Sequence, residues 1–142
     1  MVLMDVNVLV YAHREDVVDH ADYRSWLESV INANASYGFS ELVLSGFLRV
    51  VTHPKIFEIP TPLEDALKFV GQVKHQENAI NLAPGARHWP IFNDLIRATH
   101  ATGNAIPDAY HAALAIESGS EWITTDKGFK KYKGLITRHP LR

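Results

Sequence analysis

The sequence contains no cysteine, and this absence excludes several kinds of site at once. Disulfide frameworks, thiolate zinc sites and cysteine nucleophiles all need this residue type. The eight histidines show no His-Glu-x-x-His spacing or other tight ligand pattern, so a histidine zinc site is not indicated either. The chain also lacks a P-loop, a Gly-x-Ser-x-Gly sequence and a dinucleotide-binding fingerprint. The common motifs for nucleotide binding and for nucleophilic catalysis therefore do not indicate the function of this chain.

Long hydrophobic runs are also missing. No apolar run approaches the roughly 20 residues that a membrane-spanning helix needs, and residues 1–10 lack the basic leader of a signal peptide. With the missing cysteines, this predicts a protein of the reducing cytoplasm that has no membrane partner. What the chain has instead is 142 residues, 46% of them hydrophobic, which predicts a single globular domain over residues 1–142.

The formal net charge is only −2, but the basic residues are unevenly distributed. Six of the 14 lie after Asp126, and no acid follows that residue; they are Lys127, Lys130, Lys131, Lys133, Arg138 and Arg142. A local basic segment can contact phosphates even when the whole chain is slightly acidic. The alternative is a solvated terminal segment.

Helices and short strands alternate along the chain, which predicts an α/β protein with a mainly parallel sheet. Strands are predicted at 2–4, 37–39, 79–82, 122–124 and 135–137. Helices are predicted at 6–13, 19–33, 41–52, 62–75, 88–102 and 109–117, with a short lysine-rich helix after Asp126. Ser40 is the predicted N-cap of its helix, and Thr61 with Glu64 resembles a capping box.

Three acids stand where elements of this predicted fold begin or end. Asp5 and Asp126 follow strands, and Asp108 opens an alanine-rich helix. Parallel strands have their carboxyl ends at one edge of the sheet, and a right-handed crossover could place the N-terminus of the helix of Asp108 near the same edge. Three carboxylates there repel one another, and a hard divalent cation removes the repulsion. An all-oxygen ligand set suits Mg²⁺, with Mn²⁺ able to substitute.

Each of these acids also has a purely structural interpretation. Asp5 could accept hydrogen bonds from backbone amides in a strand-to-helix turn. Asp108 follows Pro107 and could simply favour the helix dipole, and Asp126 could form an ordinary Asx turn. Their shared placement at element ends favours the site.

Three stretches of the chain resemble motifs of the PIN domain, and the likeness is greatest to the VapC-type toxins of bacterial toxin–antitoxin pairs. They read Met4-Asp-Val-Asn-Val-Leu, Ile106-Pro-Asp-Ala-Tyr-His-Ala-Ala-Leu-Ala-Ile and Thr124-Thr-Asp-Lys-Gly-Phe. The stretch Phe47-Leu-Arg-Val-Val-Thr-His-Pro is similar to one branch of those toxins. The resemblance implies a three-layer α/β/α sandwich and a Mg²⁺-dependent endoribonuclease with an RNA substrate, a cognate antitoxin and a homodimeric state.

The resemblance also implies roles for individual residues. It places metal binding on Asp5, Asp108 and Asp126. Asn7 and Thr124 would support the site as polar neighbours, and Asn104 is close to a position that can be acidic in relatives. Separately, Arg49, Lys127, Lys130 and Lys131 are candidates to contact the RNA, while Arg14 is a second arginine that could contact phosphate.

The chain departs from the family at one position. Many PIN domains carry a further acid in the helix after the second strand, and here Gly46 occupies that place. Glu41, one to two turns earlier, could substitute from a shifted position as a fourth catalytic acid, or it could only satisfy the helix dipole. This departure keeps open a catalytically silent RNA- or protein-binding domain. A phosphotransfer domain fits less well, because Asn7 stands where the phosphatase pattern wants a second aspartate.

Overall fold

A computed structural model describes all residues from 1 to 142. It contains a sheet of five strands, all parallel, in the order β3-β2-β1-β4-β5. The strands are β1 (Val2–Met4), β2 (Tyr37–Phe39), β3 (Ala79–Asn81), β4 (Glu121–Ile123) and β5 (Thr137–Arg138). The helices are α1 (Val6–His13), α2 (His20–Ile31), α3 (Glu41–Val51), α4 (Leu63–Lys74), α5 (His88–Thr99) and α6 (Ala105–Ser118), with the 3₁₀ helix η1 (Lys127–Lys131). The predicted α/β class is confirmed.

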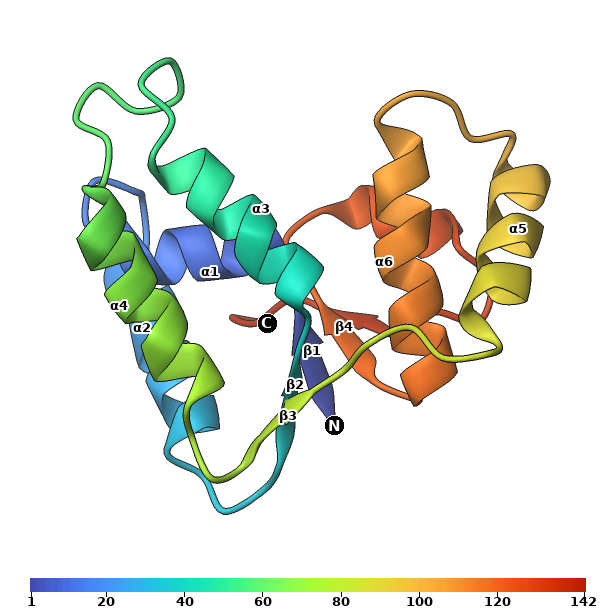
Figure 1. The fold of residues 1–142 in the computed structure, drawn as a ribbon, viewed down its shortest axis with the longest axis horizontal. Coiled ribbons are helices and arrows are strands. Elements are labelled where there is room, and N and C mark those ends of the chain that lie inside the picture. Colours follow the sequence, from blue (N-terminus) through green and yellow to red (C-terminus); the bar gives the residue numbers. More distant parts are fainter.

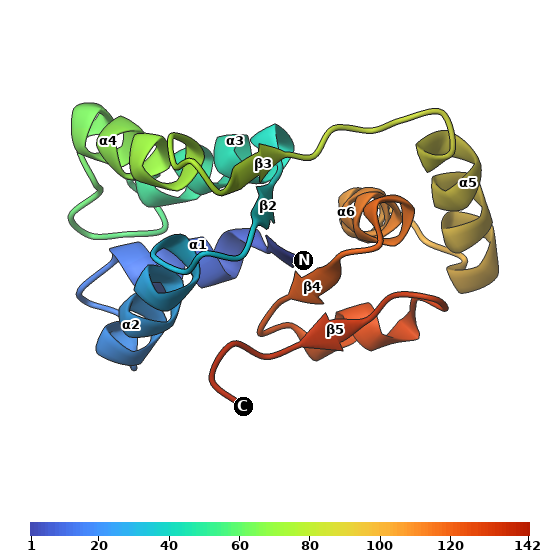
Figure 2. The same ribbon diagram turned by 90° about the horizontal axis from the view of Figure 1, so that it is seen from below.

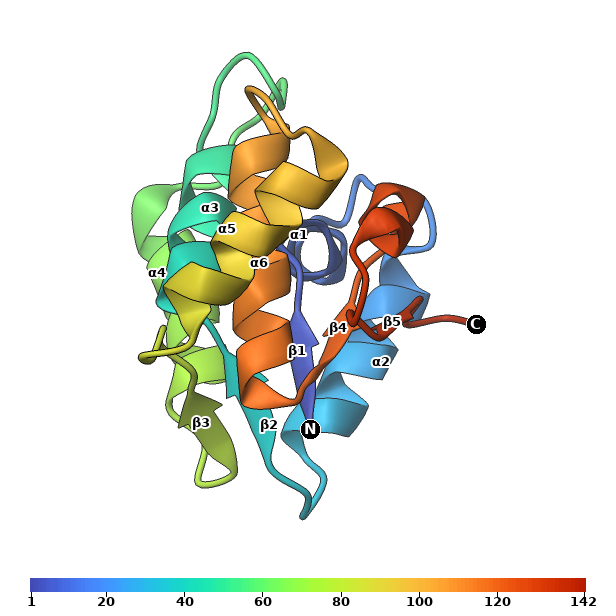
Figure 3. The ribbon, with the colours of Figure 1, turned by 90° about the vertical axis from the view of Figure 1, so that its right-hand side faces the viewer.

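The elements form three layers. Helices α1 to α4 lie on one side of the sheet, and α5 and α6 lie on the other (Figures 1 and 2). Figure 3 looks onto α5 and α6, with the strands behind them in sheet order from β3 to β5. Since every strand runs in the same direction, all carboxyl ends lie at one edge, where α1 and α3 begin directly after β1 and β2.

The core explains why α6 lies so close to the sheet. Four alanines of this helix are fully buried, and their small side chains let the helix backbone approach the strands; they are Ala109, Ala112, Ala113 and Ala115. The indole of Trp122 in β4 is also fully buried beneath them, in one hydrophobic cluster of 27 residues. No helix of the chain is both long enough and apolar enough to cross a membrane.

The start of α6 differs from the prediction. The helix begins at Ala105 rather than after Asp108, because the amides of Ala105 and Ile106 already donate to the carbonyls of Thr102 and Gly103 at 3.1 Å and start the helical turn. Pro107 is then inside the first helical turn, where a missing N–H removes no helical hydrogen bond. Asp108 consequently lies in the first turn of α6, instead of preceding the helix.

The predicted capping box at the start of α4 is wrong. Pro62 is the N-cap residue of α4, and no side chain caps the helix. The Thr61 hydroxyl is instead in contact with α1 and its end, because it lies 3.1 Å from His13 Nε2 and accepts a hydrogen bond from Arg14 Nη1 at 3.2 Å. Ser40 does cap α3, since its Oγ accepts a hydrogen bond from the Val43 amide at 3.4 Å.

Candidate active site

Three of the predicted acids line one cavity of about 380 Å³ at the carboxyl edge of the sheet. Asp5 follows β1, Asp126 follows β4, and Asp108 comes from the first turn of α6. The strand register explains the meeting of the first two, because Met4 pairs with Ile123 and the chains leave the sheet side by side. The Asp5 amide donates a hydrogen bond to the Ile123 carbonyl at 2.9 Å, which holds the backbone after β1 beside the end of β4.

Asp5 is the most enclosed of the three, with only 7% of its surface exposed. One carboxylate oxygen accepts a hydrogen bond from the Val6 amide at 2.7 Å, so Asp5 also caps α1. The other accepts from the Thr124 hydroxyl at 2.7 Å. Burial raises the pKa of Asp5 from its ordinary value of 3.8 to about 6, the two hydrogen bonds oppose that rise, and the nearby charges of Asp108 and Asp126 add to it.

Thr124 links two of the acids. Its hydroxyl donates to Asp5 Oδ2 and accepts a hydrogen bond from the Asp126 amide at 3.0 Å. Asp126 itself is exposed, and its Oδ1 accepts from the Gly128 amide at 2.8 Å, the Asx-type turn that opens η1. A single buried threonine therefore orients the Asp5 carboxylate and the backbone that carries Asp126.

Replacement of Thr124 by valine tests this linkage. The methyl group fills the same space, but Asp5 loses a hydrogen bond to its charged form. We expect the unfolding free energy to fall by about 1.5–3 kcal/mol at pH 7.5 and the pKa of Asp5 to rise above its present value of about 6. Chemical denaturation and an NMR titration of the Asp5 carboxyl carbon measure the two effects. Thr125→Val, which removes a hydroxyl without a side-chain hydrogen bond, is the matched control; equal effects in both variants would contradict the assignment.

Asp108 is half-buried and lies near both other acids. Burial raises the pKa of its carboxyl first, the Asp126 charge raises it further, and the Lys131 charge lowers it. Burial is the main cause that raises the pKa of Tyr132 to about 12, and the charges of Asp108 and Asp126 add to this rise. Mutual repulsion among the carboxylates is therefore a property of this cavity.

The two asparagines predicted to support the site lie in different places. Asn7 in α1 lines the cavity of the acids, and its Oδ1 is buried without a hydrogen-bond partner. Asn104 is exposed, takes the N-cap position of α6 without a side-chain cap bond, and does not line that cavity. The structure thus brings Asn7, but not Asn104, to the acids.

A second cavity, of about 420 Å³, adjoins the first and shares Asp5 and Asp108 with it. Gly46 and Arg49 of α3 also line this second cavity, and Arg49 forms no ion pair. A Cβ on Gly46 would lie 3.0 Å from Val6 Cγ2, so a side chain at this position requires Val6 to move.

His111 of α6 also lines this second cavity, one turn after Asp108. Burial lowers the pKa of the imidazole to about 4, so the ring is neutral near pH 7. It stacks on the Trp122 indole at a centroid distance of 5.6 Å, and its Nδ1 has no hydrogen-bond partner. A neutral ring offers no positive charge to a phosphate.

Glu41 is not brought to the three acids. Its carboxylate forms an exposed ion pair with Lys74 of α4 at 2.6 Å, and it lines neither cavity that contains Asp5. The Lys74 hydrogen bond is the main reason that the pKa of Glu41 is lowered. In this structure the side chain forms a contact between α3 and α4, which neither interpretation of its position at a helix start predicted.

The basic candidates fall into two groups. Lys127, Lys130 and Lys131 are exposed on η1 directly after Asp126, and none forms an ion pair. Arg14 is fully engaged within the chain, because it pairs with Asp16 through two hydrogen bonds of 2.9 and 2.6 Å. The three lysines, like Arg49, therefore have a charge that is free for a phosphate, whereas Arg14 does not.

The donor set suits a hard cation. All three carboxylates are oxygen donors, their repulsion favours a positive charge, and the buried Asn7 Oδ1 lacks a partner. No group of three or more Asp, Glu, His or Cys side chains is close enough to hold a metal ion by itself. This spacing is compatible with Mg²⁺, which usually keeps several waters and takes only one or two carboxylates directly.

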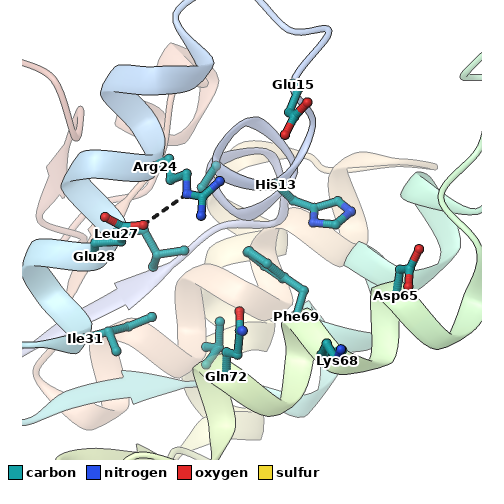
Figure 4. Close-up of a pocket in the computed structure, with 12 residues that line it drawn as sticks. His13, Glu15, Arg24, Leu27, Glu28, Ile31, Asp65, Lys68, Phe69 and Gln72 are labelled. Atoms are coloured by element: carbon teal, nitrogen blue, oxygen red, sulfur yellow. Dashed lines mark hydrogen bonds and ion pairs between the residues drawn. The ribbon is translucent and has the colours of Figure 1, made fainter.

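A separate groove of about 330 Å³ lies between α1, α2 and α4 (Figure 4). Leu27, Phe69 and Val73 form part of its apolar floor, and the Arg24–Glu28 ion pair lies at its rim. None of the predicted site residues lines this groove.

Sequence reasoning did not identify the apolar side of the acid cavity. Tyr11 of α1 and Ile56 and Phe57 of the loop before α4 line it together with the acids. Tyr11 lies six residues after Asp5 on the α1 helix, which is a signal that could have been used. The loop residues carried no such signal, because their position depends on contacts distant in sequence.

Comparisons with known proteins show the family of the chain. The PIN domain family matches residues 2–135 of the chain. The chain is 45% identical to VapC ribonuclease Mb2897 of Mycobacterium bovis, covering 99% of this chain and 96% of that protein. It is 37% identical to ribonuclease VapC25 of Mycobacterium tuberculosis, covering 95% of each.

Solved structures show the same fold. VapBC2 from Rickettsia felis, bound to a DNA fragment from its promoter, superposes with a TM-score of 0.70 at 19% identity and covers 98% of each chain. VapBC-1 from nontypeable Haemophilus influenzae superposes with a TM-score of 0.69 at 17% identity over the full length of both chains. From its sequence match and its fold, the chain belongs to the PIN-domain family and, within it, to the VapC group.

Proposed function

We propose that this chain is a metal-dependent endoribonuclease that hydrolyses RNA phosphodiester bonds in the cytoplasm as the toxin of a toxin–antitoxin pair. The observation that carries the proposal is the meeting of Asp5, Asp108 and Asp126 in one cavity. The relatives at 45% and 37% identity are named as ribonucleases, which supports the same activity here.

In this proposal Asp5, Asp108 and Asp126 hold Mg²⁺, or Mn²⁺ in its place. The bound ion would lower the pKa of a water and offset the charge that develops on the phosphate. Asp5 contributes a carboxylate that is mostly ionised at pH 7, since its pKa is about 6. Thr124 orients that carboxylate, and Asn7 offers a further oxygen from α1.

The basic residues would orient the RNA. Arg49 lines a cavity together with Asp5 and Asp108 and would hold a phosphate there, while the lysines of η1 would hold the RNA backbone further along. No side chain of the site needs to act as a nucleophile, so in-line attack by water would leave a 5′-phosphate and a 3′-hydroxyl.

Metal removal tests the activity. We expect the purified chain to cleave members of a panel of structured RNAs with Mg²⁺ or Mn²⁺, and to lose cleavage in EDTA. Mass spectrometry of the fragments should find 5′-phosphate ends. Undiminished cleavage in EDTA would exclude the metal, whereas binding without cleavage in Mn²⁺ would support the silent-domain alternative. Labelling by acetyl phosphate would point to a phosphotransfer domain.

Salt dependence tests the lysines. Each phosphate contact on a single strand contributes about −0.7 to the slope of log K against log salt concentration. Replacing Lys127, Lys130 and Lys131 by glutamine should therefore reduce the slope by about 2, measured by fluorescence anisotropy of a labelled oligoribonucleotide. Lys68→Gln, in the groove of Figure 4, is the matched control and should leave the slope unchanged. If the slope of log K against log salt concentration is unchanged in the triple variant, the lysines of η1 do not contact the RNA.

The proposal includes a protein partner and a homodimer. A cognate antitoxin would place a basic side chain in the acid cavity, where it offsets the negative charge. Adding the product of an adjacent antitoxin-like reading frame should then block cleavage, and light scattering of the free chain should give twice the mass of one chain. Cleavage that persists at saturating partner would reject inhibition at this site.

A further inference from the structure

The cavity of the acids has an apolar side that the proposed chemistry does not use. Three uncharged side chains, those of Tyr11, Ile56 and Phe57, line this side of the cavity. The same cavity is lined by Asp5 and Asp108. Phe57 is only half-buried, and Ile56 is 50% exposed. Apolar side chains at this exposure beside three carboxylates do not help to hold a cation or a phosphate.

The loop that carries Phe57 is held in place by Arg14. The guanidinium donates to the Ile59 carbonyl at 2.8 Å and to Thr61 Oγ1 at 3.2 Å, while its pairing with Asp16 fixes its own orientation. The Thr61 amide also donates to the Val51 carbonyl at 2.8 Å, which ties the loop to the end of α3. The segment is therefore an ordered part of the cavity wall.

Arg14 also lies over the Phe57 ring. Its Cζ is 4.0 Å from the ring centroid, a cation–π contact that covers one face of the ring. The Phe57 side chain nevertheless lines the cavity of the acids. An aromatic ring backed by a fixed guanidinium offers a flat surface whose orientation is set before any ligand binds.

We propose that Phe57, backed by Arg14, binds an unpaired nucleobase of the RNA next to the phosphate that meets Asp5 and Asp108. This inference rests on the proposed function and names a base subsite for it. Single-stranded RNA is recognised through bases that stack on aromatic side chains. The cavity volume of about 380 Å³ is within the range of ligand sites, roughly 300–1,000 Å³.

Electrostatics favour a base at this place over another phosphate. The three carboxylates that line the cavity repel a second anion, and the apolar side chains opposite offer no positive charge to hold one. Stacking supplies attraction that does not depend on charge and fixes the strand relative to the acids. The Tyr11 hydroxyl makes no hydrogen bond within the chain and lies in the same cavity, where it can bond to the edge of the base.

Abasic substitution along the substrate tests the subsite. An oligoribonucleotide that the chain cleaves is prepared with a single abasic residue at each position near the cut. We expect one position at which base removal raises KM about tenfold in the wild-type chain, with little change in kcat. Phe57→Ala and Phe57→Leu should raise KM for the intact RNA by a similar factor, and base removal at that position should then have no further effect.

Two further variants control the measurement. Phe57→Tyr keeps the aromatic face and should behave like the wild type. Ile59→Ala changes a 78% exposed residue of the same loop that does not line the cavity, and KM should not move. Phe57→Leu keeps the apolar volume, so it covers the case in which Phe57→Ala fails to fold.

The outcomes separate this inference from the function on which it rests. An abasic penalty that persists in full in the Phe57 variants overturns the subsite, as does the lack of any sensitive position. If the wild-type chain cleaves no RNA, the proposed function fails, and the subsite is then tested by fluorescence anisotropy with an oligoribonucleotide that the chain binds, carrying one abasic residue at each position in turn. Variants that bind RNA normally but escape the partner's inhibition would assign the Phe57 surface to a protein instead.

Discussion

Asp5→Asn is expected to lower RNA cleavage by on the order of 10³-fold or more while leaving the fold intact. Asparagine has the size of aspartate, and its Oδ1 can still accept the Val6 amide that caps α1. Its Nδ2 can donate to the Thr124 hydroxyl in place of the present bond. What the variant loses is the most buried negative charge of the cavity, which the proposed metal site needs. Single-turnover cleavage with Mg²⁺ and a circular dichroism spectrum measure the two halves of this expectation.

Glu41→Gln is the matched control for that loss. The structure pairs Glu41 with Lys74 on the surface, and an exposed pair contributes little to stability. We therefore expect cleavage within about twofold of the wild type. A loss in Glu41→Gln as large as in Asp5→Asn would mean that the site uses four acids and that α3 moves to deliver the fourth. Full activity of Asp5→Asn would contradict the proposed active site.

The central part of this arrangement could be predicted from the sequence for a simple reason. The first strand, Val2–Met4, is short, so the residue at its carboxyl end can only be Asp5. Because all strands of the sheet are parallel, Asp5 and Asp126 lie at the same edge. The positions of these two acids depend on strand direction, which the alternation of helices and strands predicts. The role of Thr124 was implied only by the resemblance to the PIN domain, and the register that pairs Met4 with Ile123 explains why Thr124 lies beside Asp5.

Other positions depend on packing that no local pattern encodes. Glu41 is at a helix start near the correct edge, yet the neighbouring α4 supplies Lys74 and draws the carboxylate away. Asn104 was expected to support the site because the resemblance places it close to a position that can be acidic in relatives, but it takes the N-cap position of α6 and is exposed. The orientation of the Phe57 ring depends on Arg14, which lies more than 40 positions earlier in the sequence. Only the folded chain shows this contact.

Asp5→Asn is also expected to stabilise the metal-free chain, and the gain should depend on pH. Burial raises the pKa of Asp5 from 3.8 in its ordinary state to about 6 in the fold. The unfolded chain therefore binds fewer protons than the folded chain between these values, and stability falls as the pH rises through them. The resulting penalty is absent below about pH 4 and complete above about pH 7, where it amounts to about 3 kcal/mol. Asparagine carries no charge and escapes it.

Denaturant unfolding in EDTA, repeated from pH 4 to pH 8, measures this effect as the difference in unfolding free energy between the variant and the wild type. The difference should grow from near zero to about 3 kcal/mol, whereas the exposed control Asp94→Asn should give a difference that stays flat. A difference that is constant with pH would mean that Asp5 titrates normally and is well solvated. Mg²⁺ should then narrow the gap by stabilising only the wild type, because a ligand that binds the folded state raises its stability. The carboxylate that destabilises the empty fold is thus the one whose charge the proposed cation would compensate.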